Sequence, residues 1–248
     1  MGARYALLMM ALLAPWVVAK PPLLQVGYFY LPPHGYTQHG EPAGFALQYF
    51  NRIAAEMGVV AQYRQEPLSR LRRNTQLDMV LYLAASPERA RRLHFAARPL
   101  LEMQGVLVVS QQSALRQITD PAQLATLRIG IWADGYLSPM LAAVRQQLEP
   151  MSGDDVIERS LQKVDLQRID AFYSPEPYAV RYVLQRMGMP QRFRLLNLPE
   201  KPVGLYPAFT SRGLTYQARF ERAAESVRKQ QPYAVLLQQM LPVTPEGG

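Results

Sequence analysis

The first half of the chain alternates short apolar runs with a segment in which apolar residues recur at helical spacing. Phe45 to Met57 places its apolar side chains on one helical face, and Gly58 supplies a stop. Strands are predicted at the apolar runs Leu23 to Tyr28, Val59 to Tyr63 and Met79 to Leu83, with a short helix from residue 67 to about 75 before the last. This βαβαβ order predicts layered α/β structure with mostly parallel strands.

The second half continues the alternation. Asp120 with Pro121 starts a short helix, and Ser138 with Pro139 starts another that reaches about Leu148. Further strands are expected at Arg128 to Trp132, Ile169 to Tyr173 and Phe193 to Leu198. Further helices are expected at Pro177 to Met187, Leu214 to about Gln230 and Tyr233 to Leu241. The whole chain is therefore predicted to be α/β.

Residues 1 to 19 have the pattern of a signal peptide. Arg4 precedes an apolar run from Tyr5 to Val18, and Val17 and Ala19 occupy the positions that favour cleavage before Lys20. A membrane helix is the alternative, but the run is shorter than the ~20 residues that a span needs. No comparable run follows in the sequence, so we expect a periplasmic mature protein that is not embedded in the membrane.

The composition excludes several kinds of chemistry. The absence of cysteine rules out a lipid-anchor thiol, disulfides, zinc-thiolate sites and a cysteine nucleophile. The chain has 27 Lys and Arg against 19 Asp and Glu, but they are dispersed, which favours capture of anionic solutes over binding to nucleic acid. His34 and His39 lie in a Pro/Gly loop and are interpreted as solvated, so no metal or other cofactor is expected.

The segment from Ser86 to Val109 carries a candidate anion clamp. Ser86 is a good N-cap, Pro87 suits the first helical position, and Glu88 favours the positive helix end. Arg89 is therefore predicted on the first turn, where a guanidinium beside free helix N–H groups is a natural receptor for a carboxylate. The alternative is a solvated basic helix, because two more arginines follow closely.

Aromatic residues gather at the ends of the predicted strands. Such rings stack on planar or cationic ligands, and phenols add hydrogen bonds, although ordinary packing at a rim is the alternative. Their convergence on one cleft predicts a ligand that is larger or flatter than a small amino acid. These residues are Tyr28, Phe29, Tyr30, Tyr36, Tyr82, Trp132, Tyr136 and Tyr173.

An ordered set of motifs resembles one protein family. The region SPERARRLHFAARP resembles the pattern (T/S)-x-E-(K/R)-x-x-x-x-x-F-(S/T)-x-P of type II periplasmic solute-binding proteins, in the polar amino-acid class (family 3) that serves ABC transporters. GEPAGFALQYFNRIAAEMG at Gly40 to Gly58, RIGIWADG at Arg128 to Gly135 and RIDAFY at Arg168 to Tyr173 resemble further segments of that class. Order and spacing match over roughly residues 25 to 240.

The resemblance implies a bilobal type II periplasmic-binding-protein fold, with two α/β lobes joined by two crossover segments. Lobe I is expected at residues 20–108 and 208–248, with lobe II at 109–207 between them. In this class a small polar solute binds between lobes that close on it. The expected protein is a monomer that hands its solute to an ABC permease or signals through a membrane sensor.

The resemblance also implies a set of ligand contacts. Arg89 matches the arginine that holds the ligand carboxylate, while the class's hydroxyl positions match Tyr82 and Ala84. On the second lobe the carboxylate-binding positions match Asp134, Gly135 and Tyr136. With the aromatic residues Tyr30 and Trp132, and with Glu176, these give the expected ligand set of Arg89, Tyr82, Tyr30, Trp132, Asp134, Tyr136 and Glu176.

The amine end of the expected site departs from the class. The aspartate that neutralises an α-ammonium group matches Pro175, which cannot accept a salt bridge. Either Glu176 substitutes after a one-residue shift, or the solute is not an ordinary α-amino acid, because an unpaired buried ammonium costs several kcal/mol. Asp170 is expected to be mainly structural.

A small-molecule lyase resembling cyclohexadienyl dehydratase is the alternative function, because that activity occurs on the same fold. It would need a poised acid or base in the cleft, for which Glu176 or Asp134 would be the candidates. The sequence has no phosphate loop, G-x-S-x-G elbow or H-E-x-x-H motif, so we expect a binding protein without catalytic residues.

The signal-peptide interpretation predicts a mature chain that begins at Lys20. Intact-mass spectrometry of protein from the periplasmic fraction should give the mass of residues 20–248. Recovery of the uncleaved chain in the membrane fraction would contradict this prediction.

Overall fold

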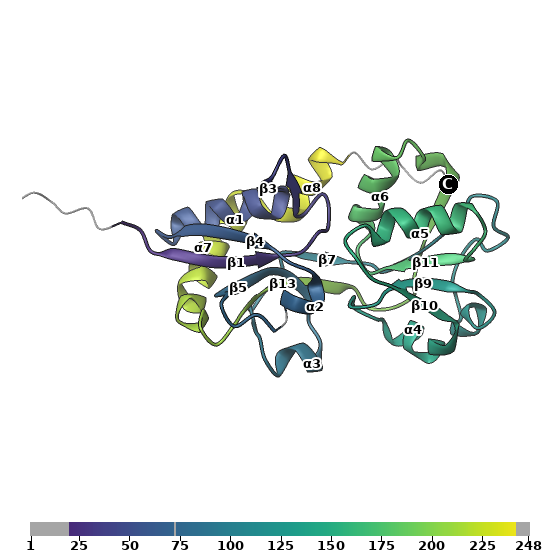
Figure 1. Ribbon diagram of the computed structural model, residues 1–248, viewed down its shortest axis with the longest axis horizontal. Coiled ribbons are helices and arrows are strands. Elements are labelled where there is room, and N and C mark those ends of the chain that lie inside the picture. Colours follow the sequence, from purple (N-terminus) through teal and green to yellow (C-terminus); the bar gives the residue numbers. More distant parts are fainter. Residues whose placement is uncertain (1–19, 72, 242–248) are drawn as a thin grey trace, which may run out of the picture.

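The computed structural model describes residues 20–71 and 73–241, which form two α/β units placed end to end (Figure 1). We call them the first lobe and the second lobe, and each is built on its own sheet. The proposed signal peptide at residues 1–19 lies outside the described residues. Among the helices of the described part, none combines the length and apolar character needed to cross a membrane.

The first lobe contains a sheet of order β4-β1-β5-β13-β6, in which β7 also pairs with β13. Strand β1 runs parallel to β4 and β5, whereas β13 runs antiparallel to β5, β6 and β7. The strands are β1 (Leu23–Tyr28), β4 (Val60–Gln65), β5 (Met79–Ala84), β6 (His94–Phe95), β7 (Leu101–Met103) and β13 (Val203–Phe209). The other elements are β2 (Tyr36–Gln38), β3 (Glu41–Ala43), α1 (Phe45–Glu56), α2 (Leu68–Leu71), α3 (Pro87–Ala90), a 3-10 turn η4 (Leu214–Tyr216), α7 (Gln217–Gln230) and α8 (Tyr233–Met240).

The second lobe contains a sheet of order β10-β9-β11-β8-β12. Strand β9 runs parallel to β10 and β11, and β8 runs antiparallel to β11 and β12. The strands are β8 (Val106–Ser110), β9 (Ile129–Trp132), β10 (Leu148–Met151), β11 (Ala171–Ser174) and β12 (Phe193–Asn197). The helices are α4 (Pro139–Ala143), α5 (Val156–Asp165) and α6 (Pro177–Arg186), with 3-10 turns η1 (Pro121–Leu124), η2 (Arg145–Gln147) and η3 (Pro190–Arg192).

Two crossover segments connect the lobes. The chain leaves the first sheet after β7 and enters the second at β8, then returns from β12 to β13 (Figure 1). The second lobe is thus inserted into the first, which confirms the bilobal α/β fold that the motif order implied. Two adjacent connections can act as a hinge, because within residues 20–71 and 73–241 they alone carry the chain between the lobes.

Helix α1 illustrates how the sequence pattern places an element. Leu47, Phe50 and Ile53 are buried along one face of the helix. Gly58 adopts a φ of 58°, the left-handed conformation that costs glycine little and ends a helix. The buried face packs against α7 and α8, so the C-terminal part of the chain completes the core of the first lobe.

The structure corrects several expected elements. Strand β10 and helix α5 were not predicted. Glu149 and Pro150 interrupt the apolar pattern of β10, whereas the buried apolar residues of α5 do follow a helical spacing, which the prediction missed. Strand β10 lies at the sheet edge, where a proline is tolerated. The helix that starts after Ser138 ends at Ala143 rather than near residue 148. In the first lobe, α2 ends at Leu71 rather than near 75, and the expected loop contains the β2-β3 hairpin.

The same carboxylate arrangement joins two neighbouring strands in each sheet. Asp78, just before β5, accepts the N–H of Gln25 in β1 at 2.7 Å and donates its own N–H back at 2.8 Å. Asp170, just before β11, accepts the N–H of Arg128 beside β9 at 2.7 Å and donates back at 2.9 Å. A guanidinium completes each arrangement, from Arg212 to Asp78 and from Arg128 to Asp170, both at 2.9 Å. Because the same contacts join strands in both sheets, Asp170 has the structural role that was expected of it.

Asp170 also makes stability depend on pH. Hydrogen bonding from the Arg128 guanidinium holds the pKa of the Asp170 carboxyl below its ordinary value. A carboxyl with a lowered pKa contributes stability above its unfolded pKa of about 3.9. That contribution is lost as the pH falls through the lowered pKa of the folded protein.

The two aspartates should differ in their contribution to stability. Asp78→Ala should lower the free energy of unfolding by ~2–4 kcal/mol, because it removes a buried carboxylate that bonds a partly buried strand N–H and the Arg212 guanidinium. Asp170→Ala should cost only ~1 kcal/mol, because its side chain is 38% exposed against 4% for Asp78. Urea denaturation of both variants measures the difference, and equal costs would contradict the argument from burial.

Candidate functional site

The two lobes enclose a small central cavity. Phe29, Ala84 and Arg89 line it from the first lobe. Trp132 and Pro175 are among the residues that line it from the second. Its volume is about 50 Å³, whereas ligand sites in proteins usually measure ~300–1,000 Å³. The lobes are therefore closed on each other, with side chains in the space that a solute would need.

Arg89 is held at the lobe interface by a helix start. The Ser86 hydroxyl accepts the N–H of Arg89 at 3.3 Å, and Pro87 occupies the first turn, as the sequence predicted. The guanidinium is buried and donates from Nη1 to the Ala84 carbonyl at 2.7 Å and from Nη2 to the Asp134 carbonyl at 3.1 Å. These acceptors belong to different lobes. Arg89 thus lies apart from the exposed Arg91 and Arg92, so the solvated-helix alternative does not apply to it.

An aromatic contact closes the interface beside Arg89. The rings of Phe29 and Trp132 meet edge to face, with centroids 5.5 Å apart. Tyr82 supports Phe29 from behind, with ring centroids 4.9 Å apart and its hydroxyl donating to the Phe29 carbonyl at 2.7 Å. Tyr82 is fully buried, and burial raises the pKa of its phenol well above the ordinary value. The structure therefore places Tyr82 behind the cleft wall and Trp132 on its surface.

Tyr30 and Tyr136 lie at the edges of the interface. The Tyr30 hydroxyl reaches across to Glu158 Oε1 of helix α5 at 3.4 Å. Tyr136 is half-buried and lines the central cavity from the second lobe. Burial raises the pKa of both phenols, so both are neutral donors at physiological pH.

Glu176 has partners inside the protein on both sides of the cleft. It caps helix α6 by accepting the N–H of Tyr178 at 3.0 Å and that of Ala179. Glu176 Oε1 also lies 3.3 Å from Nε2 of His34 in the first lobe, and Nδ1 of His34 lies 2.7 Å from the Tyr233 hydroxyl. The buried contact between His34 and Glu176 therefore joins the two lobes at a second point, in addition to Arg89.

The structure corrects the interpretation of His34. Its side chain is fully buried between Glu176 and Tyr233 rather than solvated. Only the fold could reveal this position, because its partners lie far along the sequence and the surrounding Pro/Gly loop is typical of exposed segments. Within the described residues, no group of three or more possible metal ligands gathers here or elsewhere.

Comparison with known proteins places this geometry in a family. The model for bacterial extracellular solute-binding proteins, family 3, matches residues 24–241. The chain belongs to this family. No curated protein matches the chain.

Solved structures share the fold at low sequence identity. A histidine kinase sensor domain similar to periplasmic binding proteins is 17% identical, with a TM-score of 0.74, covering 90% of this chain and 97% of that one. An ABC uptake transporter substrate-binding protein from Streptococcus pneumoniae with bound histidine is 16% identical, with a TM-score of 0.73 and coverage of 89% and 92%. An ancestral amino-acid-binding protein, a precursor of cyclohexadienyl dehydratase, is 15% identical, with a TM-score of 0.69 and coverage of 88% and 95%.

The solute-binding fold brings most of the expected ligand set to one interface. Arg89, Trp132, Tyr136 and Glu176 line the central cavity, and Asp134 contacts Arg89 through its carbonyl. Two further residues, Phe29 and His34, contribute to the closed interface but were not in the expected set. Phe29 belongs to the aromatic cluster that the sequence had identified, whereas His34 gave no usable signal.

The contacts of Glu176 predict a dual effect of its removal. Glu176→Ala should lower the free energy of unfolding by at least ~1 kcal/mol, because α6 loses its cap and His34 loses its partner. It should also enlarge the radius of gyration, because one link between the lobes is gone. Small-angle X-ray scattering and urea denaturation measure the two effects.

Asp155→Ala is the matched control for this prediction. Asp155 is exposed and pairs with Arg159 of the same lobe, so its removal should leave the radius of gyration unchanged. An equal response of the two variants would contradict the role of Glu176 in linking the two lobes.

Proposed function

We propose that the mature chain is a periplasmic solute-binding protein that captures a small polar, carboxylate-bearing solute between its lobes. Arg89 carries the proposal, because its buried guanidinium donates to one backbone carbonyl of each lobe. A carboxylate is a stronger partner for a guanidinium than a neutral carbonyl is. A solute carboxylate that replaces the Asp134 carbonyl would join the lobes through Arg89.

Solute entry requires the lobes to separate. A cavity of about 50 Å³ has room for a few water molecules but not for an amino acid or a dicarboxylate. Opening separates Phe29 from Trp132 and His34 from Glu176. The measured affinity would therefore include the free energy of breaking these contacts.

The cleft favours a solute whose main charge is negative. Pro175 stands where the family resemblance expects an aspartate, and the carboxylate of Glu176 already accepts backbone N–H groups and faces His34. A buried ammonium group would need a carboxylate, and among the described residues that line the cleft only the engaged Glu176 carries one. The aromatic wall of Phe29 and Trp132 suits a flat or extended solute.

We propose delivery to an ABC permease or signalling through a membrane sensor, with the protein acting as a monomer. The likeness to a transporter substrate-binding protein and to a kinase sensor domain supports both routes equally. The lyase alternative has less support. Glu176 is engaged as a cap, and Asp134 faces Arg89 with its backbone carbonyl, so we propose no catalytic role for either.

Arg89 variants test the anion clamp. A thermal-shift screen of dicarboxylates, aromatic acids, opines and amino acids first identifies the solute, since a ligand that binds only the folded state raises its apparent stability. Arg89→Ala should then weaken binding of that solute by ~2–4 kcal/mol, because a buried charge loses its partner. Arg89→Lys should restore only part of it, because an ammonium lacks the planar fork.

Arg92→Ala is the matched control, since Arg92 is exposed and follows the same helix. Calorimetry should give this variant the affinity of the unchanged protein. If Arg89→Ala also retained that affinity, the anion clamp would be wrong.

A further inference from the structure

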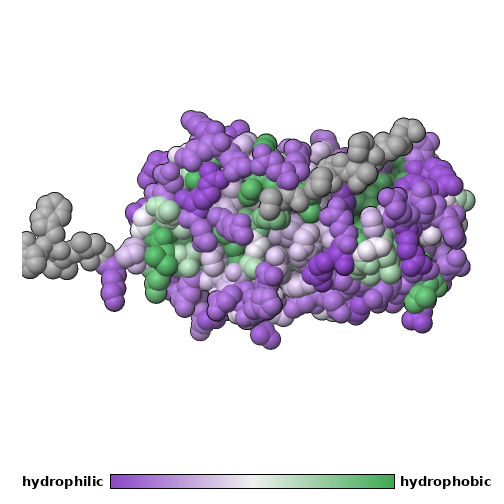
Figure 2. All heavy atoms as spheres, turned by 90° about the horizontal axis from the view of Figure 1, so that it is seen from above, coloured by the Kyte–Doolittle hydropathy of each residue, from purple (hydrophilic) through white to green (hydrophobic). Residues whose placement is uncertain are grey.

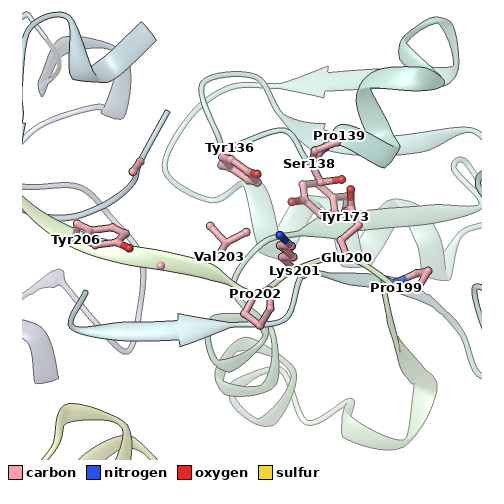
Figure 3. A pocket seen from close by; sticks show the side chains of 13 residues that line it. Tyr136, Ser138, Pro139, Tyr173, Pro199, Glu200, Lys201, Pro202, Val203 and Tyr206 are labelled. Carbon is pink, nitrogen blue, oxygen red and sulfur yellow. The ribbon is translucent and has the colours of Figure 1, made fainter. Parts of the chain in front are cut away.

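Two hollows outside the central cleft differ in charge. The hollow beside the crossover segments is lined by Glu200 and Lys201, which are neighbours of opposite charge (Figure 3). The other hollow lies on the first lobe and measures about 420 Å³. Its described lining residues include four arginines and no acidic residue. We call it the arginine hollow and define it by Arg73, Arg91, Arg92 and Arg212.

Three segments that are distant in the sequence form the arginine hollow. Arg73 follows α2, Arg91 and Arg92 follow α3, and Arg212 follows β13. Helices α2 and α3 both lie in the lower half of the first lobe in Figure 1. Figure 2 shows the upper side, where hydrophilic residues surround separate apolar areas. The fold therefore gathers arginines that are dispersed in the sequence.

The arginine hollow lies at the end of the first sheet that is remote from the central cleft. Strand β5 begins directly after Asp78, which binds Arg212, and ends at Ala84, which lines the cleft. The six residues of β5 span ~17 Å at ~3.3 Å per residue. A ligand in the arginine hollow would therefore be separate from a solute in the cleft.

Most of the positive charge in the arginine hollow is not neutralised within the protein. Arg73, Arg91 and Arg92 are exposed, and their side chains form no ion pair or hydrogen bond with a described residue. Arg212 is held in place, because its Nε donates to the Asp78 carboxylate at 2.9 Å and its Nη1 donates to a backbone carbonyl at 3.1 Å. Four guanidinium groups against this one carboxylate leave three positive charges.

The positive surface continues into an adjoining hollow of about 350 Å³, which the same three exposed arginines also line. Glu88 is the one acidic residue among its described lining residues, and it is already engaged with another group. Arg89 borders this hollow as well, but its guanidinium donates to the carbonyls at the lobe interface. Like charges held this close repel each other, so a bound anion would stabilise the folded lobe.

A phosphate group suits the arginine hollow better than a carboxylate does. The terminal oxygens of a phosphate diverge in space, so guanidinium groups from different segments can each bind one of them. The two oxygens of a carboxylate lie in one plane and serve one guanidinium best. Thr75 and Ser211 line the same hollow with exposed hydroxyl groups, which are further donors to phosphate oxygens.

We propose that the arginine hollow binds a multivalent phosphate anion. Arg73, Arg91 and Arg92 would supply the charge, and Arg212 would form a fixed wall. The same chemistry occurs in free phosphates and in the head groups of anionic phospholipids, so the experiment includes both. The site does not depend on Arg89 or on the solute proposed for the central cleft.

Inorganic pyrophosphate is the probe for a free anion. In calorimetry at low ionic strength, the unchanged protein should bind it at least about fivefold more tightly than citrate, which carries a similar charge on carboxylates. Added salt should weaken the binding, because it screens exposed charges. Equal affinity for citrate would overturn the assignment to phosphate.

Removal of three charges from the hollow should remove most of this binding. The triple variant Arg73→Gln, Arg91→Gln and Arg92→Gln, here called the hollow variant, should bind pyrophosphate at least about tenfold more weakly. This expectation follows because each exposed ion pair contributes up to about fivefold.

A matched control removes three positive charges from α7. Arg219→Gln, Arg222→Gln and Lys229→Gln replace exposed residues that do not line the arginine hollow. This variant should retain the pyrophosphate affinity of the unchanged protein within about twofold. Equal weakening in the control and the hollow variant would mean attraction by net charge alone, which overturns the site.

Vesicles distinguish the two sources of phosphate. Sedimentation with phosphatidylglycerol vesicles but not with phosphatidylcholine vesicles, lost in the hollow variant, would assign a lipid head group if pyrophosphate does not bind. The proposal is overturned if the unchanged protein binds neither pyrophosphate at millimolar concentration nor phosphatidylglycerol vesicles.

Arg89→Ala separates the arginine hollow from the cleft of the proposed function. Pyrophosphate captured in the cleft would lose affinity in Arg89→Ala and keep it in the hollow variant, and this pattern would overturn the proposal. The reverse pattern supports it, whichever solute the cleft binds.

Discussion

The closed arrangement of the two lobes depends on the buried guanidinium of Arg89. Arg89 cannot remain charged in a closed interface without acceptors, because an unpaired buried charge costs several kcal/mol. In the closed arrangement the carbonyl groups of Ala84 and Asp134 supply them, one from each lobe. The contact that joins the lobes therefore uses the donors that a solute carboxylate would use. A solute carboxylate and the Asp134 carbonyl would compete for the same guanidinium.

Two other contacts join the lobes in the closed interface. Phe29 against Trp132 removes apolar surface from water, and His34 with Glu176 forms a buried polar link. These contacts fill the space where smaller side chains would leave room for a solute. The molecule thus combines the scaffold of its family with a cleft lined by its own bulky groups. Open space lies instead beside the crossover segments.

Burial separates residues that looked equivalent in the sequence. Tyr82 and Tyr136 were both expected at strand ends, yet Tyr82 lies within β5, fully buried and bonded to the Phe29 carbonyl, whereas Tyr136 follows β9 and lines both the central cavity and the hollow beside the crossover segments. Glu176, expected near an ammonium group, caps α6 because Pro177 starts a helix directly after it. Pro175 thus removes the expected aspartate, and the helix start at Pro177 gives the carboxylate between the two prolines a local backbone partner.

The sequence by itself determined the family, the α/β alternation, the insertion of one lobe into the other and the helix start that positions Arg89. These follow from local patterns: apolar periodicity, the Ser86 cap and the ordered motifs. It did not determine β10, whose apolar pattern is interrupted by Glu149 and Pro150. Nor could it determine the acceptors of Arg89 or the partners of His34. Those contacts join residues far apart in the chain, and only the packing of the two lobes decides which backbone carbonyl and which carboxylate face them.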